Sequence, residues 1–233
     1  FKFPKIVKEG HIFVLIFAAI TIIGFFISSI LGLLLLILTV WCALFFRDPE
    51  RVTPLIKNAV IAPADGIVQN VDYSLPPKDL NMEDKEMLRI SIFMNVFNVH
   101  INRTPVTGSI KTISYIPGKF FNASLDKASE YNERQSFVIE TEQNTKVIMV
   151  QIAGLIARRI VKFVNENAEV KAGEKIGLIR FGSRVDVYLP KEITPLVIKG
   201  QTIVGGETIL AHLSDNQLEA IEGTVLDRPE KAL

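Results

Sequence analysis

The sequence predicts a mainly β protein of the α+β class, in which a compact β-barrel or sandwich with few short helices follows an N-terminal hydrophobic helical hairpin. Two observations lead to this fold class. Residues 12–46 form an uncharged, strongly apolar run, and the chain beyond residue 51 consists mostly of short runs rich in Val and Ile. We therefore expect a membrane anchor segment over residues 1–51 and one globular domain over residues 52–233, which is long enough to bury a core.

The apolar run has 35 residues, too many for one straight membrane-spanning helix. A helix of that length would measure about 52 Å, whereas the hydrocarbon core of a bilayer is about 30 Å thick and needs about 20 residues. The segment GFFISSILG, residues 24–32, is the expected break between two passes. Lysines precede the run and arginines follow it, which favours two cytoplasmic ends. A hairpin that enters the bilayer only partly, or lies in its interface, stays an alternative.

Turn-forming residues separate the strand-like runs of the remaining chain, for example Asp65-Gly66 and Ala172-Gly173. This spacing is typical of a β-barrel or sandwich. The turns in VIAPADGIVQNV and NENAEVKAGEKIGLIRF resemble those of lipoyl-type barrels, although no carrier lysine accompanies them. The best helix candidate is SLDKASEYNER, residues 124–134, which could equally be a loop over a site. The predicted strands are AVIAPADGIVQNV, LRISIFM, SFVIET, TKVIMVQIAG, RIVKFV, KIGLIRF and RVDVYLP.

Composition and charge exclude several function classes. The formal net charge is +1 at pH 7, which gives no electrostatic basis for a nucleic-acid partner. The single cysteine, Cys42, excludes a disulfide within the chain and a cysteine-based metal site. The sequence contains no phosphate-cradling glycine loop and no metal-ligand cluster. We therefore expect no metal, and chemistry that depends on the chain's own side chains.

Three residue types point to nucleophilic chemistry. The segment LIRFGSRVDVYLP, residues 178–190, is interpreted as two strand halves with Gly182-Ser183 between them, and the simplest meaning of that glycine is a bulge. Asp65 in APADG has an equally plain interpretation as an Asp-Gly turn, and His100 in FMNVFNVHINR could be structural. Together, however, they supply a nucleophile, a base and a carboxylate that orients the base. A serine hydrolase is a candidate, although the G-x-S-x-G elbow is absent.

Six motifs, in order along the chain, carry a resemblance to a known family: FRDPER, APADG, NVFNVHINR, GKFFNASLDKASEYNERQ, VQIAGLIARRIV and FGSRVDVYLP. They are similar to those of phosphatidylserine decarboxylase, specifically the short membrane-anchored type of bacteria and archaea. The similarity covers most of the chain, from about residue 40 to about residue 210. The apolar N-terminal segment also resembles that type.

The resemblance implies an inactive proenzyme that cleaves itself between Gly182 and Ser183. Ser183 would attack the carbonyl of Gly182 to form an ester, and β-elimination would leave a dehydroalanine that hydrolyses to a pyruvoyl group with loss of ammonia. The products would be a β chain of residues 1–182 and an α chain of residues 183–233. They would stay together as a heterodimer, with further dimerisation left open. His100 matches the family's base, and Asp65 matches the carboxylate that holds its imidazole.

The resemblance also implies what the processed chain does. The pyruvoyl group derived from Ser183 would be the cofactor of a carboxy-lyase that converts phosphatidylserine to phosphatidylethanolamine and carbon dioxide. It would form a Schiff base with the substrate amine and act as an electron sink, and His100 would then reprotonate Cα. One departure is Phe97, because longer bacterial members are expected to carry a second histidine there. His100 or a water would have to act in its place.

A phospholipid substrate implies the cell membrane, with the catalytic domain on the cytoplasmic face. The pair Phe120-Phe121 could enter the bilayer or cover the site. The alternative from another class is a non-catalytic, membrane-tethered lipoyl-like β-barrel adaptor, although such adaptors carry long helical hairpins with heptads that are absent here. A lipid phosphate needs cationic partners, and the candidates are Arg103, Arg158, Arg159, Lys162, Arg180 and Arg184.

Overall fold

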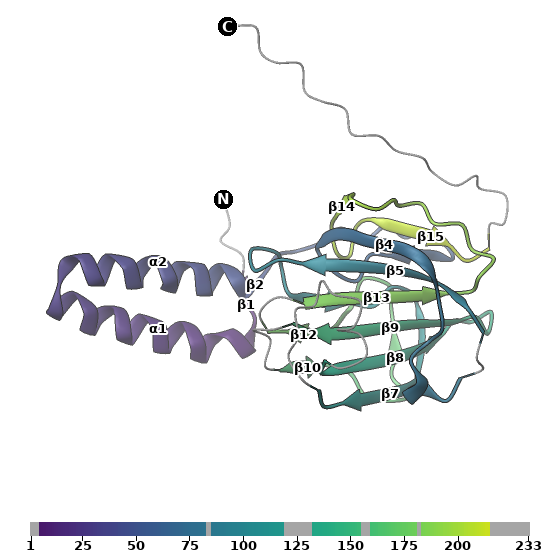
Figure 1. Cartoon of the computed structure of the whole chain (residues 1–233), viewed down its shortest axis with the longest axis horizontal. Helices are drawn as coiled ribbons and strands as arrows, with labels where there is room; N and C mark the ends of the chain where they lie inside the picture. The colour runs from purple at the N-terminus through teal and green to yellow at the C-terminus, as the bar shows by residue number, and fades with distance from the viewer. Residues whose placement is uncertain (1–4, 83–84, 119–131, 155–158, 181–182, 215–233) are drawn as a thin grey trace, which may run out of the picture.

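A helical hairpin projects from one end of a β domain (Figure 1). The computed structural model describes residues 5–82, 85–118, 132–154, 159–180 and 183–214. Helix α1 (Lys8–Ile27) and helix α2 (Ser29–Phe45) are separated only by Ser28, which is extended with φ −160° and ψ 137°. The predicted hairpin, with its break between residues 24 and 32, is thus confirmed.

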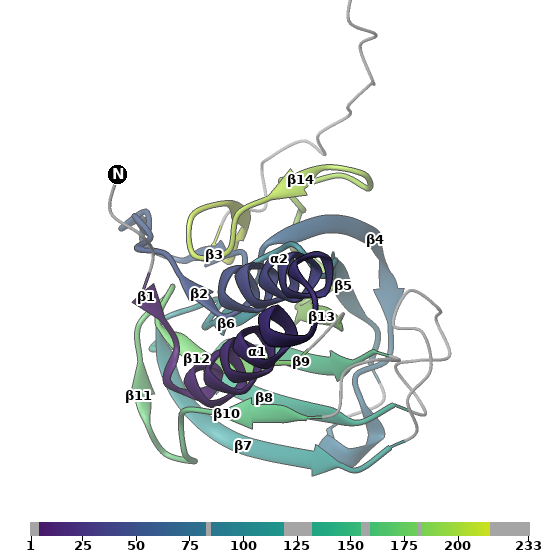
Figure 2. The ribbon, with the colours of Figure 1, turned by 90° about the vertical axis from the view of Figure 1, so that its left-hand side faces the viewer.

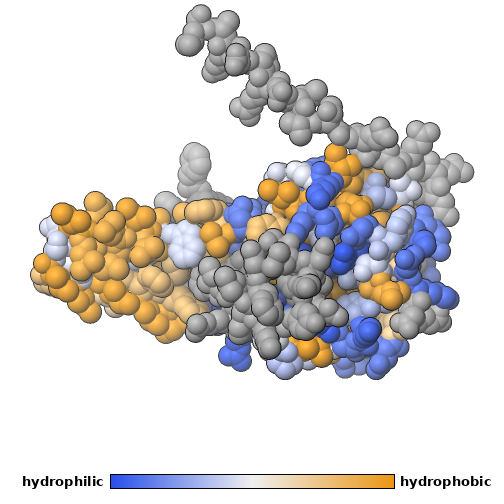
Figure 3. Space-filling view, in the orientation of Figure 1, coloured by the Kyte–Doolittle hydropathy of each residue, from blue (hydrophilic) through white to orange (hydrophobic). Residues whose placement is uncertain are grey.

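The two helices contact each other through small and hydroxyl side chains. Thr21 Oγ1 and Thr39 Oγ1 share a 2.7 Å hydrogen bond across the hairpin. A Cβ at Gly24 would lie 2.5 Å from a side-chain atom of Leu35, so a larger residue there would displace the Leu35 side chain at this close approach. The outer surface of the hairpin is almost uniformly hydrophobic (Figure 3). Among the described residues, α1 is long and apolar enough to cross a membrane, whereas α2 is shorter.

The β domain is built from antiparallel strands. In chain order the remaining elements are β1 (Lys5–Ile6), β2 (Arg47–Asp48), β3 (Ala59–Ile61), β4 (Gly66–Ser74), the 3-10 helix η1 (Lys78–Leu80), β5 (Met87–Met94), β6 (Ile101–Arg103), β7 (Gly108–Ile116), β8 (Arg134–Glu140), β9 (Lys146–Ala153), β10 (Ile160–Lys162), β11 (Glu169–Val170), β12 (Lys175–Ile179), β13 (Ser183–Leu189), β14 (Thr202–Ile203) and β15 (Ile209–His212). Within the described residues, a large sheet has the order β11-β7-β8-β9-β13-β5-β4-β14 and a small sheet has the order β10-β12-β6. Strands β3 and β15 form a further pair, as do β1 and β2. The predicted mainly β fold is confirmed.

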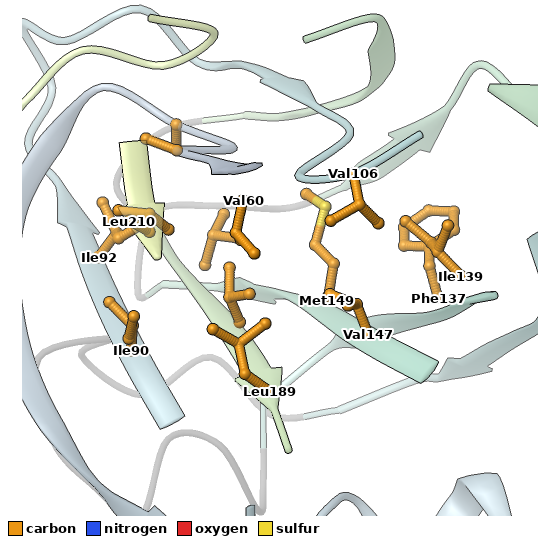
Figure 4. Packing of buried hydrophobic residues seen from close by; sticks show 14 of the residues in the cluster. Val60, Ile90, Ile92, Val106, Phe137, Ile139, Val147, Met149, Leu189 and Leu210 are labelled. Atoms are coloured by element: carbon orange, nitrogen blue, oxygen red, sulfur yellow. The ribbon is translucent and has the colours of Figure 1, made fainter. Parts of the chain in front are cut away.

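An apolar core lies between the curled large sheet and the strands packed against it (Figure 4). On β13, Val185, Val187 and Leu189 point into this core, whereas Arg184 and Asp186 face the opposite side. This alternation follows from the pleat of a β-strand. We call the side of the large sheet that carries Val185 the inner face and the other side the outer face. Figure 2 looks along the hairpin and shows its helices over the end of the domain where β6, β10 and β12 lie.

The junction between β12 and β13 differs from the predicted arrangement. The periodicity of residues 178–190 predicts one strand that is interrupted at its centre, but β12 belongs to the small sheet and β13 to the large sheet. Ser183 is the first residue of β13, where it pairs with Met94 of β5 and with Ala153 of β9. The interpretation as a bulge within one strand is therefore wrong. The chain instead passes from one layer of the fold to the other at this point.

Candidate active site

Ser183 lies at the entry to the central strand of the large sheet. Its side chain is fully buried, and its Oγ has no hydrogen-bond partner in the part of the chain that the structure describes. Strand alternation puts this side chain on the inner face, together with Val185, and its neighbours in register, Met94 and Ala153, belong to the same core. A buried hydroxyl without a partner is costly, by about 1–3 kcal/mol. Such a group needs a reason to be there, and a reactive role is one.

His100 lies at the other side of the same junction. The backbone N–H of Ile179, the last residue of β12, donates to the His100 carbonyl at 3.3 Å. The histidine therefore sits beside the end of β12, and the chain needs only four more residues to reach Ser183. The imidazole is fully buried. The structure thus brings two of the three predicted catalytic residues to the same junction between the sheets.

The hydrogen bonds of His100 define which of its ring nitrogens is basic. Nδ1 lies 2.9 Å from the carbonyl oxygen of Asn98, and a carbonyl only accepts, so Nδ1 carries the proton in the neutral ring. Nε2 then has a free lone pair, and it is buried with no hydrogen-bond partner within the described residues. Burial lowers the pKa of His100 from 6.5 to about 4, the Asn98 carbonyl opposes this shift, and the charge of Arg47 adds to it. The imidazole is therefore a neutral base at pH 7.

A pair of buried amides lies beside Ser183 and was missed by the sequence reasoning. Gln151 Nε2 donates to Asn102 Oδ1 at 2.7 Å, and Asn102 Nδ2 lies 3.5 Å from the sulfur of Met94, the register partner of Ser183. The Oε1 atom of Gln151 is buried without a partner. A usable signal exists in the sequence, because Gln151 interrupts the otherwise apolar run of β9. A polar residue inside a buried strand needs a partner or a function.

Asp65 is held by other groups. Its carboxylate accepts two hydrogen bonds from Arg51 Nη2, at 2.7 and 2.9 Å, and one from the backbone N–H of Gly205 at 2.8 Å. A Cβ at Gly205 would lie 2.8 Å from the backbone of Ala64, so this approach requires glycine. Among the described residues there is no hydrogen bond between Asp65 and His100. The role of Asp65 in holding the imidazole stays a prediction.

The candidate phosphate-binding cations divide into two groups. Arg103 donates to the carbonyls of Gly173 and Pro49, and Arg184 is fully buried against Asp186. Three others, Arg159, Lys162 and Arg180, form no ion pair within the described part of the chain, and Arg180 lies 5.0 Å over the ring of Phe13 in α1. The nearby charge of Glu9 partly compensates Arg180. These three lie on or beside β10 and β12, close to the base of the hairpin (Figure 2).

Several predicted features lie outside the described residues: Gly182, Arg158, Phe120-Phe121 and most of the helix predicted over 124–134. The last residue of that helix, Arg134, begins β8. Phe97 is described, and its side chain is largely exposed, while its carbonyl accepts a 2.8 Å hydrogen bond from Arg47 Nη2. The apolar ring of Phe97 has no proton to donate.

Comparison with known proteins defines the class first. The family model described as phosphatidylserine decarboxylase matches residues 38–211, so the chain is an enzyme of the decarboxylase class. Relatives named phosphatidylserine decarboxylase proenzyme occur in Rickettsia bellii and Rickettsia felis, each 56% identical over 209 residues that cover 90% of both chains. The relative of that name in Rickettsia typhi is 53% identical over 217 residues, or 93% of this chain and 94% of its own.

The chain belongs to the phosphatidylserine decarboxylase family. The similarity covers both the β domain and most of the hairpin, so the apolar segment is shared with relatives rather than peculiar to this chain. Membership of an enzyme family removes the adaptor and the serine hydrolase from consideration. It leaves open how the residues at the β12–β13 junction act.

Proposed function

We propose that this chain decarboxylates phosphatidylserine to phosphatidylethanolamine, using a pyruvoyl group made from its own Ser183. Cleavage of the Gly182–Ser183 bond would yield a β chain of residues 1–182 and an α chain of residues 183–233. One observation carries the proposal beyond family membership. Among the described residues, Ser183 Oγ and His100 Nε2 are both buried without hydrogen-bond partners, one at the start of β13 and the other beside the end of β12. A nucleophile and a base in that state are suited to react with the chain itself, since no solvent separates them from it.

Self-cleavage follows from these two groups. His100 Nε2 takes the proton from Ser183 Oγ, which attacks the carbonyl carbon of Gly182. The C–N bond then breaks, the nitrogen of residue 183 receives the proton, and an ester joins the two residues. Removal of the Cα proton of residue 183 expels the Gly182 carboxylate by β-elimination. Hydrolysis of the remaining enamine by water releases ammonia and leaves the pyruvoyl carbonyl.

The surroundings of residue 183 fit such a group. Strand β13 pairs along its length with β5 on one side and β9 on the other, so a break before Ser183 leaves residue 183 fixed in the sheet. A ketone conjugated with an amide carbonyl supplies an electron sink for decarboxylation, which otherwise requires an added cofactor. His100 lies beside Ile179, four residues before this position, and either its imidazole, once protonated, or a water would supply the proton to Cα.

The hairpin supports a lipid substrate. Its apolar surface and the positive residues at its base favour insertion into the bilayer with the β domain on the cytoplasmic face. The cations Arg159, Lys162 and Arg180, which form no ion pair among the described residues, lie at the level where the hairpin meets the domain. A lipid phosphate placed there would lie close to residue 183, because three extended residues from Arg180 span at most about 10 Å.

The test is the mass of the purified chain on a denaturing gel and in a mass spectrometer. The expected result is a C-terminal fragment of 51 residues, 183–233, whose blocked N-terminus resists Edman degradation. The Ser183→Ala chain should remain whole and should release no carbon dioxide from carboxyl-labelled phosphatidylserine. A single intact chain that still decarboxylates this lipid would refute the proposal.

The proposed role of Asp65 has its own test. If the carboxylate orients His100, Asp65→Asn should leave the chain uncut, whereas Arg51→Met, which removes only its ion-pair partner, should permit cleavage. A carboxylate that merely joins Arg51 to the turn at Gly205 would give similar defects in both variants. That second outcome would assign Asp65 to the scaffold.

A further inference from the structure

The C-terminal end of the hairpin contacts the candidate active site directly. The ring of Phe45, the last residue of α2, lies against the imidazole of His100, with ring centroids 4.1 Å apart and planes inclined by 31°. Both side chains are buried, and only 1% of the Phe45 surface is exposed. Residues of α1, α2, β6 and β12 share this apolar cluster, whose buried members are Cys42, Phe45, Phe46, Val99, Ile101 and Leu178.

Further contacts hold Phe45 in place. Phe46 meets it edge-on at 5.0 Å, and Phe13 of α1 stacks on Phe46 at 5.4 Å. Arg47 donates to the carbonyl of Leu44 in α2 and to the carbonyl of Phe97 in the turn before His100. The end of the hairpin is therefore tied both to the turn that precedes the histidine and to the histidine ring.

The surroundings of His100 contain little that would favour a charged imidazole. Arg47 is the charged group that acts on it, and its positive charge disfavours protonation. Cys42 of α2 lies in the same cluster, and Arg180 follows the end of β12, whose Ile179 N–H binds the His100 carbonyl. Among the described residues, the polar contact that favours a charged ring is the Asn98 carbonyl at Nδ1. Burial is the largest cause of the lowered pKa of His100, and the Phe45 ring is one of the groups that cover the imidazole.

We propose that Phe45 is a positioning residue that closes one wall of the active site over His100, so that the hairpin is a working part of that site as well as an anchor. The proposal rests on the proposed role of His100 as the base of self-cleavage. It implies that the C-terminal end of α2 both sets how deeply the domain sits at the membrane and excludes water from His100.

The direct test is a titration of His100 in the uncut Ser183→Ala chain, followed by NMR with 15N-labelled histidine in detergent micelles. The chain has three histidines, so the His100 signal can be assigned with a His100→Gln variant. Phe45→Ala should admit water and raise the pKa of His100 by about one unit or more towards its ordinary value. Phe45→Leu, which keeps the site apolar, should stay near the parent value, and the parent ring should show Nε2 as its unprotonated nitrogen.

The matched control is Phe17→Ala, which removes a ring from the same cluster without a ring contact to His100. It should leave the His100 titration unchanged within about 0.3 units, which is small beside ordinary protein pKa shifts. An unchanged pKa in Phe45→Ala, or an equal rise in Phe17→Ala, would overturn the proposal. Because the chain is uncut in this experiment, its outcome does not depend on whether the decarboxylase mechanism is right.

A second readout uses freshly translated chains with Ser183 intact and follows the appearance of the cleaved fragment at pH 5 and pH 7.5. The parent chain should cleave at similar rates, because its base is neutral at both. In Phe45→Ala the rate at pH 5 should fall about tenfold relative to pH 7.5 if the pKa rises to near 6. Equal ratios in both chains would contradict the proposal, whereas absence of cleavage in the parent would refute the proposed function instead.

Discussion

The two faces of β13 bury polar side chains in opposite ways. On the outer face, Arg184 and Asp186 are fully buried, with Nε 2.9 Å from Oδ1 and Nη2 2.9 Å from Oδ2. On the inner face, Ser183 Oγ and Gln151 Oε1 are buried just as deeply and have no hydrogen-bond partner among the described residues. One strand therefore carries a buried ion pair on its outer face and only uncharged polar groups on its inner face. On the outer face, Ser91 Oγ beside Asp186 also lacks a hydrogen bond among the described residues.

This difference suggests different roles for the two faces, with the outer pair serving the fold and the inner groups serving the proposed reaction. A buried charge is tolerated when its partner offsets the loss of hydration, and the outer pair meets that condition. The inner groups have no such compensation among the described residues, and the reactive role proposed for Ser183 would account for their cost. Changes on the inner face should therefore affect cleavage more than stability, and changes on the outer face should do the reverse.

The largest expected effect is on cleavage, and it comes from the proposed base. His100→Ala should slow the appearance of the C-terminal fragment by about 10²–10⁴-fold, because the Ser183 proton loses its acceptor. A time course on denaturing gels measures this. His212→Ala, at the end of β15, is the matched control and should process at the parent rate. Normal processing of His100→Ala would remove the base role assigned to it.

The outer face should respond in stability. Asp186→Ala leaves the Arg184 charge buried without its carboxylate and should lower the free energy of unfolding by about 3–5 kcal/mol. Denaturant titration of the Ser183→Ala chain measures this without interference from cleavage. Lys191→Ala removes an exposed ion pair with Glu86 and should cost no more than about 1 kcal/mol. Similar losses in the two variants would mean that burial of the outer pair has no special importance.

The neutral state of His100 predicts an acid sensitivity. Its pKa is lowered from 6.5 to about 4 on folding, so between these values the unfolded chain binds more protons than the folded chain. This contribution lowers the free energy of unfolding as the pH falls from 6.5 to about 4, by about 3 kcal/mol in total. Denaturant titrations of Ser183→Ala with and without His100→Gln measure it. Identical pH dependence in the two chains would contradict the buried neutral ring.

The smallest change in stability is expected when both members of a buried polar pair are replaced, and such double variants can be compared on the two faces. Replacing both members of a buried polar pair by apolar residues is often nearly neutral. Arg184→Met with Asp186→Leu, and Asn102→Leu with Gln151→Leu, should therefore each alter the free energy of unfolding by about 1 kcal/mol or less. Cleavage should persist in the outer double variant and slow at least about tenfold in the inner one. Equal cleavage in both would remove the functional distinction between the faces.

Much of the fold follows from local patterns. The uncharged run predicts the hairpin because its apolar length and the glycines and serines of residues 24–32 can be seen in the sequence alone. For the same reason, the Val- and Ile-rich runs predict β5, β8, β9 and β13. The change of sheet between β12 and β13 is not predictable in this way. Alternation continues on both sides of the junction, and periodicity does not say which neighbours a strand will pair with.

Candidate site residues can be predicted from sequence when the residue type itself indicates the chemistry. They are missed when their place in the site depends on contacts between distant segments. Their residue types make Ser183 and His100 recognisable as a candidate nucleophile and a candidate base. The partners of Asp65, in contrast, come from segments at Arg51 and Gly205 that no spacing rule connects. The contact of Phe45 with His100 could not be predicted for a different reason. In a run where nearly every residue is apolar, nothing distinguishes the ring that meets His100 from its neighbours.

The position of Ser183 at the start of a central strand changes the molecularity of unfolding. An uncut chain unfolds and refolds as one molecule, whereas a chain cut before β13 has its α chain held between β5 and β9 by hydrogen bonds and packing alone. Once such a molecule unfolds, its pieces diffuse apart, and recovery requires a second-order encounter that dilution slows. Maturation would then leave an assembly that survives by resisting unfolding, and heat would inactivate it irreversibly where the Ser183→Ala precursor recovers.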